Sequence, residues 1–207
     1  MSRPRLIVFA GLPGVGKSAI AEKVARRLGA VWLRVDTVEA AILQAGVSPS
    51  FETGLAAYLV ARDVAEPHLR AGGAAVVDAV NGVEPARAMW RELAQRCSAD
   101  LRVIEVRCSD RDEHRRRVEA RSSATPPLRM PTWEEVLHRE YLPWTEPVLV
   151  LDGVRSPEAN ARTVLRWLAS ASRTRGAGRP VARARGDAGA RVSDGGRSLR
   201  NSARRRV

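Results

Sequence analysis

Short apolar runs alternate with segments of helical periodicity along the first 170 residues. Five runs rich in Val, Ile, Leu and Ala predict buried strands at residues 5–10, 31–35, 74–77, 101–107 and 148–151. Between them, apolar residues recur every three or four positions, as at Ile20, Val24 and Leu28. This spacing predicts helices over residues 17–29, from 36 onward, and over 52–71, 84–97, 110–121, 132–142 and 156–169.

The alternation of strands and helices indicates one α/β domain over residues 1–170. Parallel strands need a crossover between them, and an intervening helix supplies it. We therefore expect a five-stranded parallel sheet with helices on both faces. Ligands of such sheets bind at the carboxyl ends of the strands, so candidate chemistry is sought there.

The apolar periodicity stops after Ala171, and Gly, Arg, Ala and Ser dominate residues 171–207. Such a composition predicts a disordered tail. This segment carries eleven arginines against Asp187 and Asp194, so it holds +9 of the chain's formal net charge of +12. The predicted domain is therefore nearly neutral. Any affinity for nucleic acid is expected to come from the tail.

Composition bounds the class of protein. Of the 207 residues, 44% are hydrophobic and 28% charged, which is typical of a globular protein. No apolar run approaches the roughly 20 residues that cross a bilayer, and the first residues lack the apolar core of a signal peptide. Cys97 and Cys108 have neither disulfide-framework nor metal-site spacing. We expect a cytoplasmic protein without a membrane partner, either a monomer or a homodimer.

The turn after the first strand carries the clearest chemical motif. Its sequence GLPGVGKS, residues 11–18, fits G-x-x-x-x-G-K-[ST] between a strand and a helix. Glycines let backbone N–H groups turn around a phosphate, Lys17 reaches the β- and γ-phosphates, and the Ser18 hydroxyl can ligate Mg²⁺. We expect ATP with Mg²⁺ to bind here. The predicted nucleotide-binding residues are Gly11, Leu12, Pro13, Gly14, Val15, Gly16, Lys17, Ser18 and Ala19.

An aspartate ends the second predicted strand in the sequence RVDTVE. If the strands align, Asp36 lies near the γ-phosphate, where a kinase needs a carboxylate to orient the acceptor hydroxyl and take its proton. We predict that Asp36 is the general base and contacts the substrate. Asp36 and Glu39 also have the spacing of a helix-capping box, and both interpretations stay open.

A second aspartate ends the third strand in VVDAVN. Asp78 has the position of a Walker B residue, which supports Mg²⁺ directly or through water, and we also predict that it contacts the substrate. Asn81 is a further candidate for a hydrogen bond to the substrate. The alternative for both residues is a turn that they initiate.

An arginine-rich helix follows the fourth strand in HRRRVEAR. Arg117 and Arg121 are four residues apart and share a helical face. They could grip the transferring phosphoryl group as part of a helical lid, and Arg129 in the following Pro-rich loop could join them. An exposed basic face is the alternative.

The four motifs in this order resemble those of the small P-loop kinases of the AAA_33 type. These proteins are relatives of gluconate kinase, chloramphenicol phosphotransferase, polynucleotide kinase and zeta toxin, and the resemblance spans residues 5–169. It implies ATP-dependent O-phosphorylation on a P-loop kinase core. It also implies that Asp36 binds or deprotonates the acceptor and that Arg117 and Arg121 contact phosphates. The sequence departs from gluconate kinases after Arg121, so no acceptor is carried over.

Two classes of function follow. The first is a phosphotransferase for the hydroxyl group of a sugar, nucleoside or antibiotic, with catalytic residues Asp36, Lys17, Arg117 and Arg121; antibiotic resistance is one role it could serve. The second is a nucleic-acid-associated NTPase or polynucleotide 5′-kinase that the basic tail recruits. A GTPase switch is disfavoured because the chain has no Asn-Lys-x-Asp motif.

Overall fold

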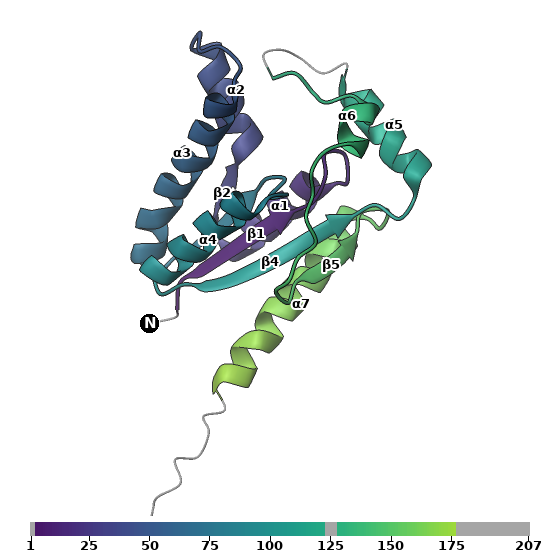
Figure 1. The fold of residues 1–207 in the computed structure, drawn as a ribbon. Helices are drawn as coiled ribbons and strands as arrows, with labels where there is room; N and C mark the ends of the chain where they lie inside the picture. The colour runs from purple at the N-terminus through teal and green to yellow at the C-terminus, as the bar shows by residue number, and fades with distance from the viewer. Residues whose placement is uncertain (1–2, 123–127, 177–207) are drawn as a thin grey trace, which may run out of the picture.

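A five-stranded parallel sheet forms the centre of the fold (Figure 1). The structure is a computed structural model that describes residues 3–122 and 128–176, except for the side chains of 121–122 and 171–176. The strand order is β2-β3-β1-β4-β5. The strands are β1 (Arg5–Ala10), β2 (Val31–Arg34), β3 (Ala74–Asp78), β4 (Asp100–Arg107) and β5 (Leu149–Asp152). All pairings are parallel, which confirms the predicted sheet.

Helices cover both faces of this sheet. They are α1 (Lys17–Leu28), α2 (Val35–Gln44), α3 (Phe51–Arg70), α4 (Glu84–Arg96), α5 (Arg111–Ser122), α6 (Trp133–Leu137) and α7 (Pro157–Gly176). One core packs α3 and α4 against the face that carries Leu6 and Val8. The other packs α1 and α7 against the face that carries Ile7 and Phe9. Alternate strand residues thus point to opposite cores, as a sheet buried on both sides requires.

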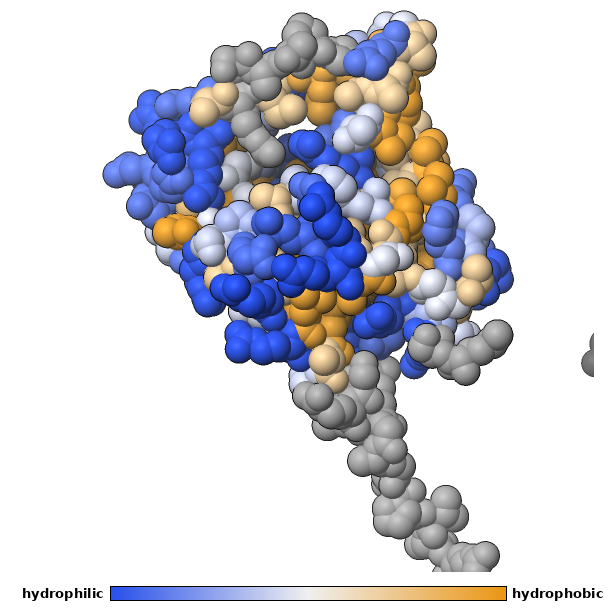
Figure 2. Space-filling model, turned by 180° about the vertical axis from the view of Figure 1, so that it is seen from behind, coloured by the Kyte–Doolittle hydropathy of each residue, from blue (hydrophilic) through white to orange (hydrophobic). Residues whose placement is uncertain are grey.

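Two helical pairs extend past the carboxyl ends of the strands (Figure 1). We call them the α2–α3 arm and the α5–α6 arm. The α2–α3 arm exposes Phe51 by 81% and Leu55 by 45%, and apolar side chains of this kind are visible on the surface in Figure 2. The α5–α6 arm lies beyond the phosphate loop. The arms stand on either side of the edge where ligands of parallel sheets bind.

Two predicted helix ends differ from the structure by several residues. The helix expected over 132–142 ends at Leu137, and residues 138–148 form an irregular segment that we call the strap. Arg87 on α4 explains part of the difference, because it binds the backbone carbonyls of Leu142 and Pro143 in extended chain. The last helix continues to Gly176, past the expected end at 169. The division at residue 170 stays a prediction, and residues 177–207 of the predicted tail lie outside the described residues.

None of the described helices combines the length and apolar character that crossing a membrane would require.

Candidate functional site

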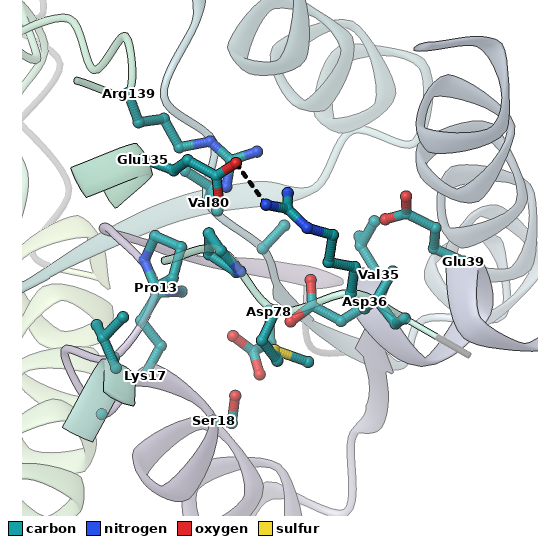
Figure 3. A pocket seen from close by; sticks show the side chains of 18 of the residues that line it. Pro13, Lys17, Ser18, Val35, Asp36, Glu39, Asp78, Val80, Glu135 and Arg139 are labelled. Carbon is teal, nitrogen blue, oxygen red and sulfur yellow. Dashed lines mark hydrogen bonds and ion pairs between the residues drawn. The ribbon is translucent and has the colours of Figure 1, made fainter. Parts of the chain in front are cut away.

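A cavity of about 420 Å³ opens at the carboxyl edge of the sheet, between the phosphate loop and the two arms (Figure 3). Its floor comes from the loop after β1 and from the end of β3, and its walls come from α2, α3 and residues 128–139. The charged or hydroxyl-bearing side chains that line it are Lys17, Ser18, Asp36, Glu39, Tyr58, Asp78, Arg129, Glu135 and Arg139. The strand-end residues Asp36 and Asp78 are thus brought together with the phosphate loop.

The phosphate loop has a backbone shape that glycine permits. Gly11 has φ 137° and Gly16 has φ 96°, both in the region that other residues avoid. Gly16 is the N-cap of α1 and provides no side chain to the first backbone N–H groups of the helix. Those donors and the positive end of the helix dipole suit an anion. Lys17 donates to the carbonyl of Leu12 at 2.9 Å, which holds its side chain along the loop.

The α5–α6 arm packs directly on the phosphate loop. His114 Nε2 lies 2.7 Å from the carbonyl oxygen of Pro13, and because that oxygen can only accept, Nε2 carries the proton. The His114 ring meets Trp133 edge-on, with 5.1 Å between ring centroids. A Cβ added at Gly14 would lie 2.5 Å from a methyl group of Val118. Any movement of this arm would therefore change its contacts with the phosphate loop.

Asp78 and Ser18 form a pair of oxygen ligands at the base of the cavity. Asp78 is 2% exposed, and both Asp78 and Ser18 line the cavity. Asp78 Oδ2 is buried and has no hydrogen-bond partner among the described residues. Burial raises the pKa of Asp78, and the Lys17 ammonium and the Ser18 hydroxyl counteract part of that rise. Carboxylate and hydroxyl oxygens fit Mg²⁺, and the unsatisfied oxygen favours a cation there.

Lys17 and Lys23 offer a matched test of nucleotide binding, since they are the only lysines in the chain. Lys17→Ala is expected to raise the Kd of Mg·ATP roughly tenfold or more, because the interaction between the buried ammonium group and the nucleotide phosphates would be lost. Lys23→Ala removes an ion pair with Glu158 at 3.4 Å on the exposed side of α1 and should leave the Kd unchanged. Calorimetric titration measures both; equal Kd values for the two variants would contradict the assignment.

Asp36 lies in the first turn of α2 and points into the cavity (Figure 3). The proposed capping box is wrong, because Arg34 is the N-cap and no side chain caps the helix. The Arg34 guanidinium lies 3.8 Å from its carboxylate. No capping bond uses this aspartate, and its carboxylate faces the space beside the phosphate loop.

Asn81 does not reach the cavity, which corrects the prediction that it contacts substrate. It is fully buried, with its Nδ2 donating to the carbonyl of Phe9 at 2.8 Å. Its Oδ1 accepts from Trp90 Nε1 at 2.8 Å. Both ends of the amide are therefore used to join β1 to α4.

Asn81→Asp tests this structural assignment. Aspartate tolerates the positive φ of 49° and can still accept from Trp90, but it cannot donate to Phe9 and it buries a carboxyl group. We expect the free energy of unfolding to fall by about 1–3 kcal/mol. Urea unfolding measures this loss. An unchanged unfolding energy together with a raised acceptor KM would restore the substrate role.

The predicted lid arginines have different surroundings. Arg117 does not line the cavity; it donates to Glu113 at 2.6 Å and to the carbonyl of Gly153 at 2.9 Å, close to Gly16 of the loop. The side chain of Arg121 lies outside the described residues. Arg129 lines the cavity and pairs with Glu135 at 2.8 Å. A grip of Arg117 and Arg121 on the phosphoryl group stays a prediction.

Four charged or hydroxyl-bearing residues of the cavity are not marked as substrate contacts by the sequence. The spacing of Glu39 from Asp36 indicates only a capping role, and no motif marks Tyr58, Glu135 or Arg139. Tyr58 accepts from the backbone N–H of Asn81 at 3.3 Å, and burial raises its pKa to about 12. The helical spacing of residues 51, 55 and 58 places Tyr58 on the same face of α3 as Phe51. This spacing is the one signal in the sequence that could have marked Tyr58.

Comparison with known families supports a nucleotide-binding fold. The AAA_33 family, described as an AAA domain, matches residues 6–139. None of the curated proteins matches the sequence significantly.

Solved structures share the fold at low sequence identity. A gluconokinase from Sinorhizobium meliloti 1021 aligns with TM-score 0.62 and 17% identity, covering 84% of this chain and 97% of that chain. The APS kinase CysC of Mycobacterium tuberculosis, in complex with AMPPNP and APS, aligns with TM-score 0.59 and 22% identity over 82% and 99%. Chaetomium thermophilum Kti12, in complex with ADP-AlF3, aligns with TM-score 0.62 and 22% identity over 80% and 98%. The architecture is that of small P-loop kinases.

Proposed function

The chain belongs to the AAA_33 family, and from this premise we propose that it is a kinase that transfers the γ-phosphoryl group of ATP to a hydroxyl group of a small molecule. One observation carries the proposal: the phosphate loop and the Asp36 carboxylate open into the same cavity. The kinase fold and the nucleotide analogues in similar structures, AMPPNP and ADP-AlF3, are in keeping with it.

Each residue has a separate task in this reaction. The loop N–H groups and Lys17 hold the triphosphate and stabilise charge on the γ-phosphate oxygens. When bound at Ser18 and Asp78, Mg²⁺ would neutralise charge between the β- and γ-phosphates. Asp36 orients the acceptor hydroxyl toward phosphorus and takes its proton as the new P–O bond forms. The bond from the γ-phosphorus to the bridging oxygen breaks, ADP leaves, and Asp36 returns the proton to water.

Mass spectrometry of an acceptor library incubated with Mg·ATP tests the proposal. The library holds sugars, nucleosides, aminoglycoside and nucleoside antibiotics, and 5′-hydroxyl oligonucleotides. We expect one phosphoryl group to be added to a small compound, and the Lys17→Ala protein serves as the control for contaminating kinases. Phosphorylation of oligonucleotides alone would favour the nucleic-acid alternative. ATP binding with no acceptor phosphorylated would overturn the kinase proposal.

A further inference from the structure

Tyr58 has a hydroxyl proton that no hydrogen bond uses within the described parts of the chain. The phenolic oxygen accepts a hydrogen bond from the backbone N–H of Asn81 at 3.3 Å. Because an N–H group can only donate, the Tyr58 O–H proton points elsewhere and needs an acceptor of its own. Tyr58 also lines the cavity. Its hydroxyl is therefore a donor for a molecule that enters the cavity.

A network of contacts holds this donor in position. The Tyr58 ring lies 6.2 Å from the Trp90 ring, centroid to centroid, at an interplanar angle of 37°. Trp90 Nε1 donates to Asn81 Oδ1 at 2.8 Å, and Asn81 Nδ2 donates to the carbonyl of Phe9 on β1 at 2.8 Å. Tyr58, Asn81 and Trp90 thus form one unit that is tied to the central strand. A donor held in this way loses little conformational entropy when it binds a ligand.

Tyr58 belongs to the wall of the cavity that the α2–α3 arm forms. It lies one helical turn along α3 from Gly54, where an added Cβ would stand 3.8 Å from Glu39 Oε1 of α2. Burial raises the pKa of Tyr58 to about 12, and the charges of Asp36, Arg139 and Glu39 also act on its hydroxyl. The hydroxyl therefore keeps its proton at neutral pH and serves as a donor, not as a base.

Asp36 connects this wall to the nucleotide side of the cavity. Lys17 and Ser18 lie on the phosphate-loop side, and Glu39 lies away from them (Figure 3). The Asp36 charge acts on Asp78 as well as on Tyr58, so Asp36 is within electrostatic reach of both sides. Because the triphosphate occupies the loop side, an acceptor whose reacting hydroxyl meets Asp36 extends along the wall that carries Tyr58.

We propose that the Tyr58 hydroxyl donates a hydrogen bond to a second oxygen of the acceptor, so that the acceptor is a compound with at least two oxygen-bearing carbons. The inference rests on the proposed kinase function and names a specificity-determining residue for it. A compound whose only oxygen is the reacting hydroxyl would leave the Tyr58 proton unpaired. A site built around such a donor discriminates against that compound.

Tyr58→Phe removes the donor and keeps the ring. For the library compound that the unmodified protein phosphorylates, we expect KM to rise roughly tenfold, because one hydrogen bond to the acceptor is lost. The value of kcat and the Kd of Mg·ATP should each change by less than about twofold, since the lost interaction binds the ground state and the transition state alike.

Tyr141→Phe is the matched control, since Tyr58 and Tyr141 are the two tyrosines of the chain. The Tyr141 oxygen also accepts one N–H, from Trp144 Nε1 at 3.2 Å, and burial raises its pKa to about 12 as well. Tyr141 does not line the cavity. Its replacement should leave the acceptor KM unchanged, because Arg87 still anchors the strap. Melting temperatures of both variants verify folding.

Analogues that each lack one oxygen connect the effect to the acceptor. The sets are glucose with 2-deoxyglucose and 3-deoxyglucose, adenosine with 2′-deoxyadenosine and 3′-deoxyadenosine, and kanamycin B with its 3′-deoxy form, tobramycin. In the set whose parent is phosphorylated, loss of the oxygen that Tyr58 binds should lower kcat/KM roughly tenfold. In Tyr58→Phe the same analogue should match its parent, because the hydrogen bond is already absent. A purely structural role for Tyr58 would reduce the use of parent and analogue equally.

The outcomes separate this inference from the function on which it rests. An unchanged KM in Tyr58→Phe, a loss confined to kcat, an equal rise of KM in Tyr141→Phe, or an equal loss for the parent and every analogue would overturn the inference and leave the kinase proposal intact. Absence of phosphorylation across the whole library would overturn the kinase proposal, and the inference with it.

Discussion

Replacing Asp36 with Asn is expected to lower kcat for phosphoryl transfer by roughly 10²–10⁴-fold, because a positioned general base contributes about that much. The amide keeps the shape of the side chain but cannot take the hydroxyl proton. Asp36 lies on α2 and is not part of the phosphate loop itself, so the Kd of Mg·ATP should stay the same or fall slightly as a negative charge is removed. Steady-state kinetics with the phosphorylated acceptor and calorimetric titration of ATP measure the two quantities.

Asp63→Asn is the matched control for this substitution. Asp63 is an exposed carboxylate on α3 that pairs with Arg62 at 2.7 Å, outside the cavity. Its replacement should change neither kcat nor the Kd of ATP, since exposed ion pairs contribute little. If Asp36→Asn turns over at the same rate as Asp63→Asn, Asp36 is not the base, and the other cavity carboxylates become the candidates.

The parts of the site that the sequence predicted are those that local chain order determines. GLPGVGKS sits between a strand and a helix, so its fold follows from neighbouring residues alone. Asp36 and Asp78 each lie at the end of a strand or just beyond it, and parallel strands end at one edge, so both residues are expected near the loop. The predicted parallel sheet was therefore sufficient to place both aspartates in the same cavity.

The remaining parts depend on contacts between residues far apart in the chain. Asn81 follows a strand as Asp78 does, but its amide is taken by Phe9 and Trp90, and no local pattern reveals that. Arg139 was expected within a helix over 132–142. It enters the cavity wall because the helix stops at Leu137 and the strap follows a different path. Tertiary hydrogen bonds at Arg87 determine that path, and propensity cannot predict them.

Arg87→Met is expected to reduce the free energy of unfolding by about 3–5 kcal/mol, because the guanidinium is a buried anchor for the strap. Arg87 is 3% exposed and donates to the carbonyls of Asn81, Gly82, Leu142 and Pro143. Its guanidinium carbon also lies 3.8 Å from the centroid of the Trp144 ring. Methionine fills much of the volume but leaves these carbonyls without their donor. Urea unfolding of the purified variant measures the loss.

Arg91→Met, one helical turn further along α4, distinguishes buried anchoring of the strap backbone from the loss of surface ion pairs. Arg91 pairs with Glu84 and with Glu146 of the strap near the surface, so we expect its loss to cost less than about 1 kcal/mol. The strap begins next to Leu137 and includes Arg139, so a loosened strap should also raise the acceptor KM in Arg87→Met while the Kd of ATP stays unchanged. Equal stability of the two variants would show that the strap does not depend on Arg87, and the path of residues 138–148 would need another cause.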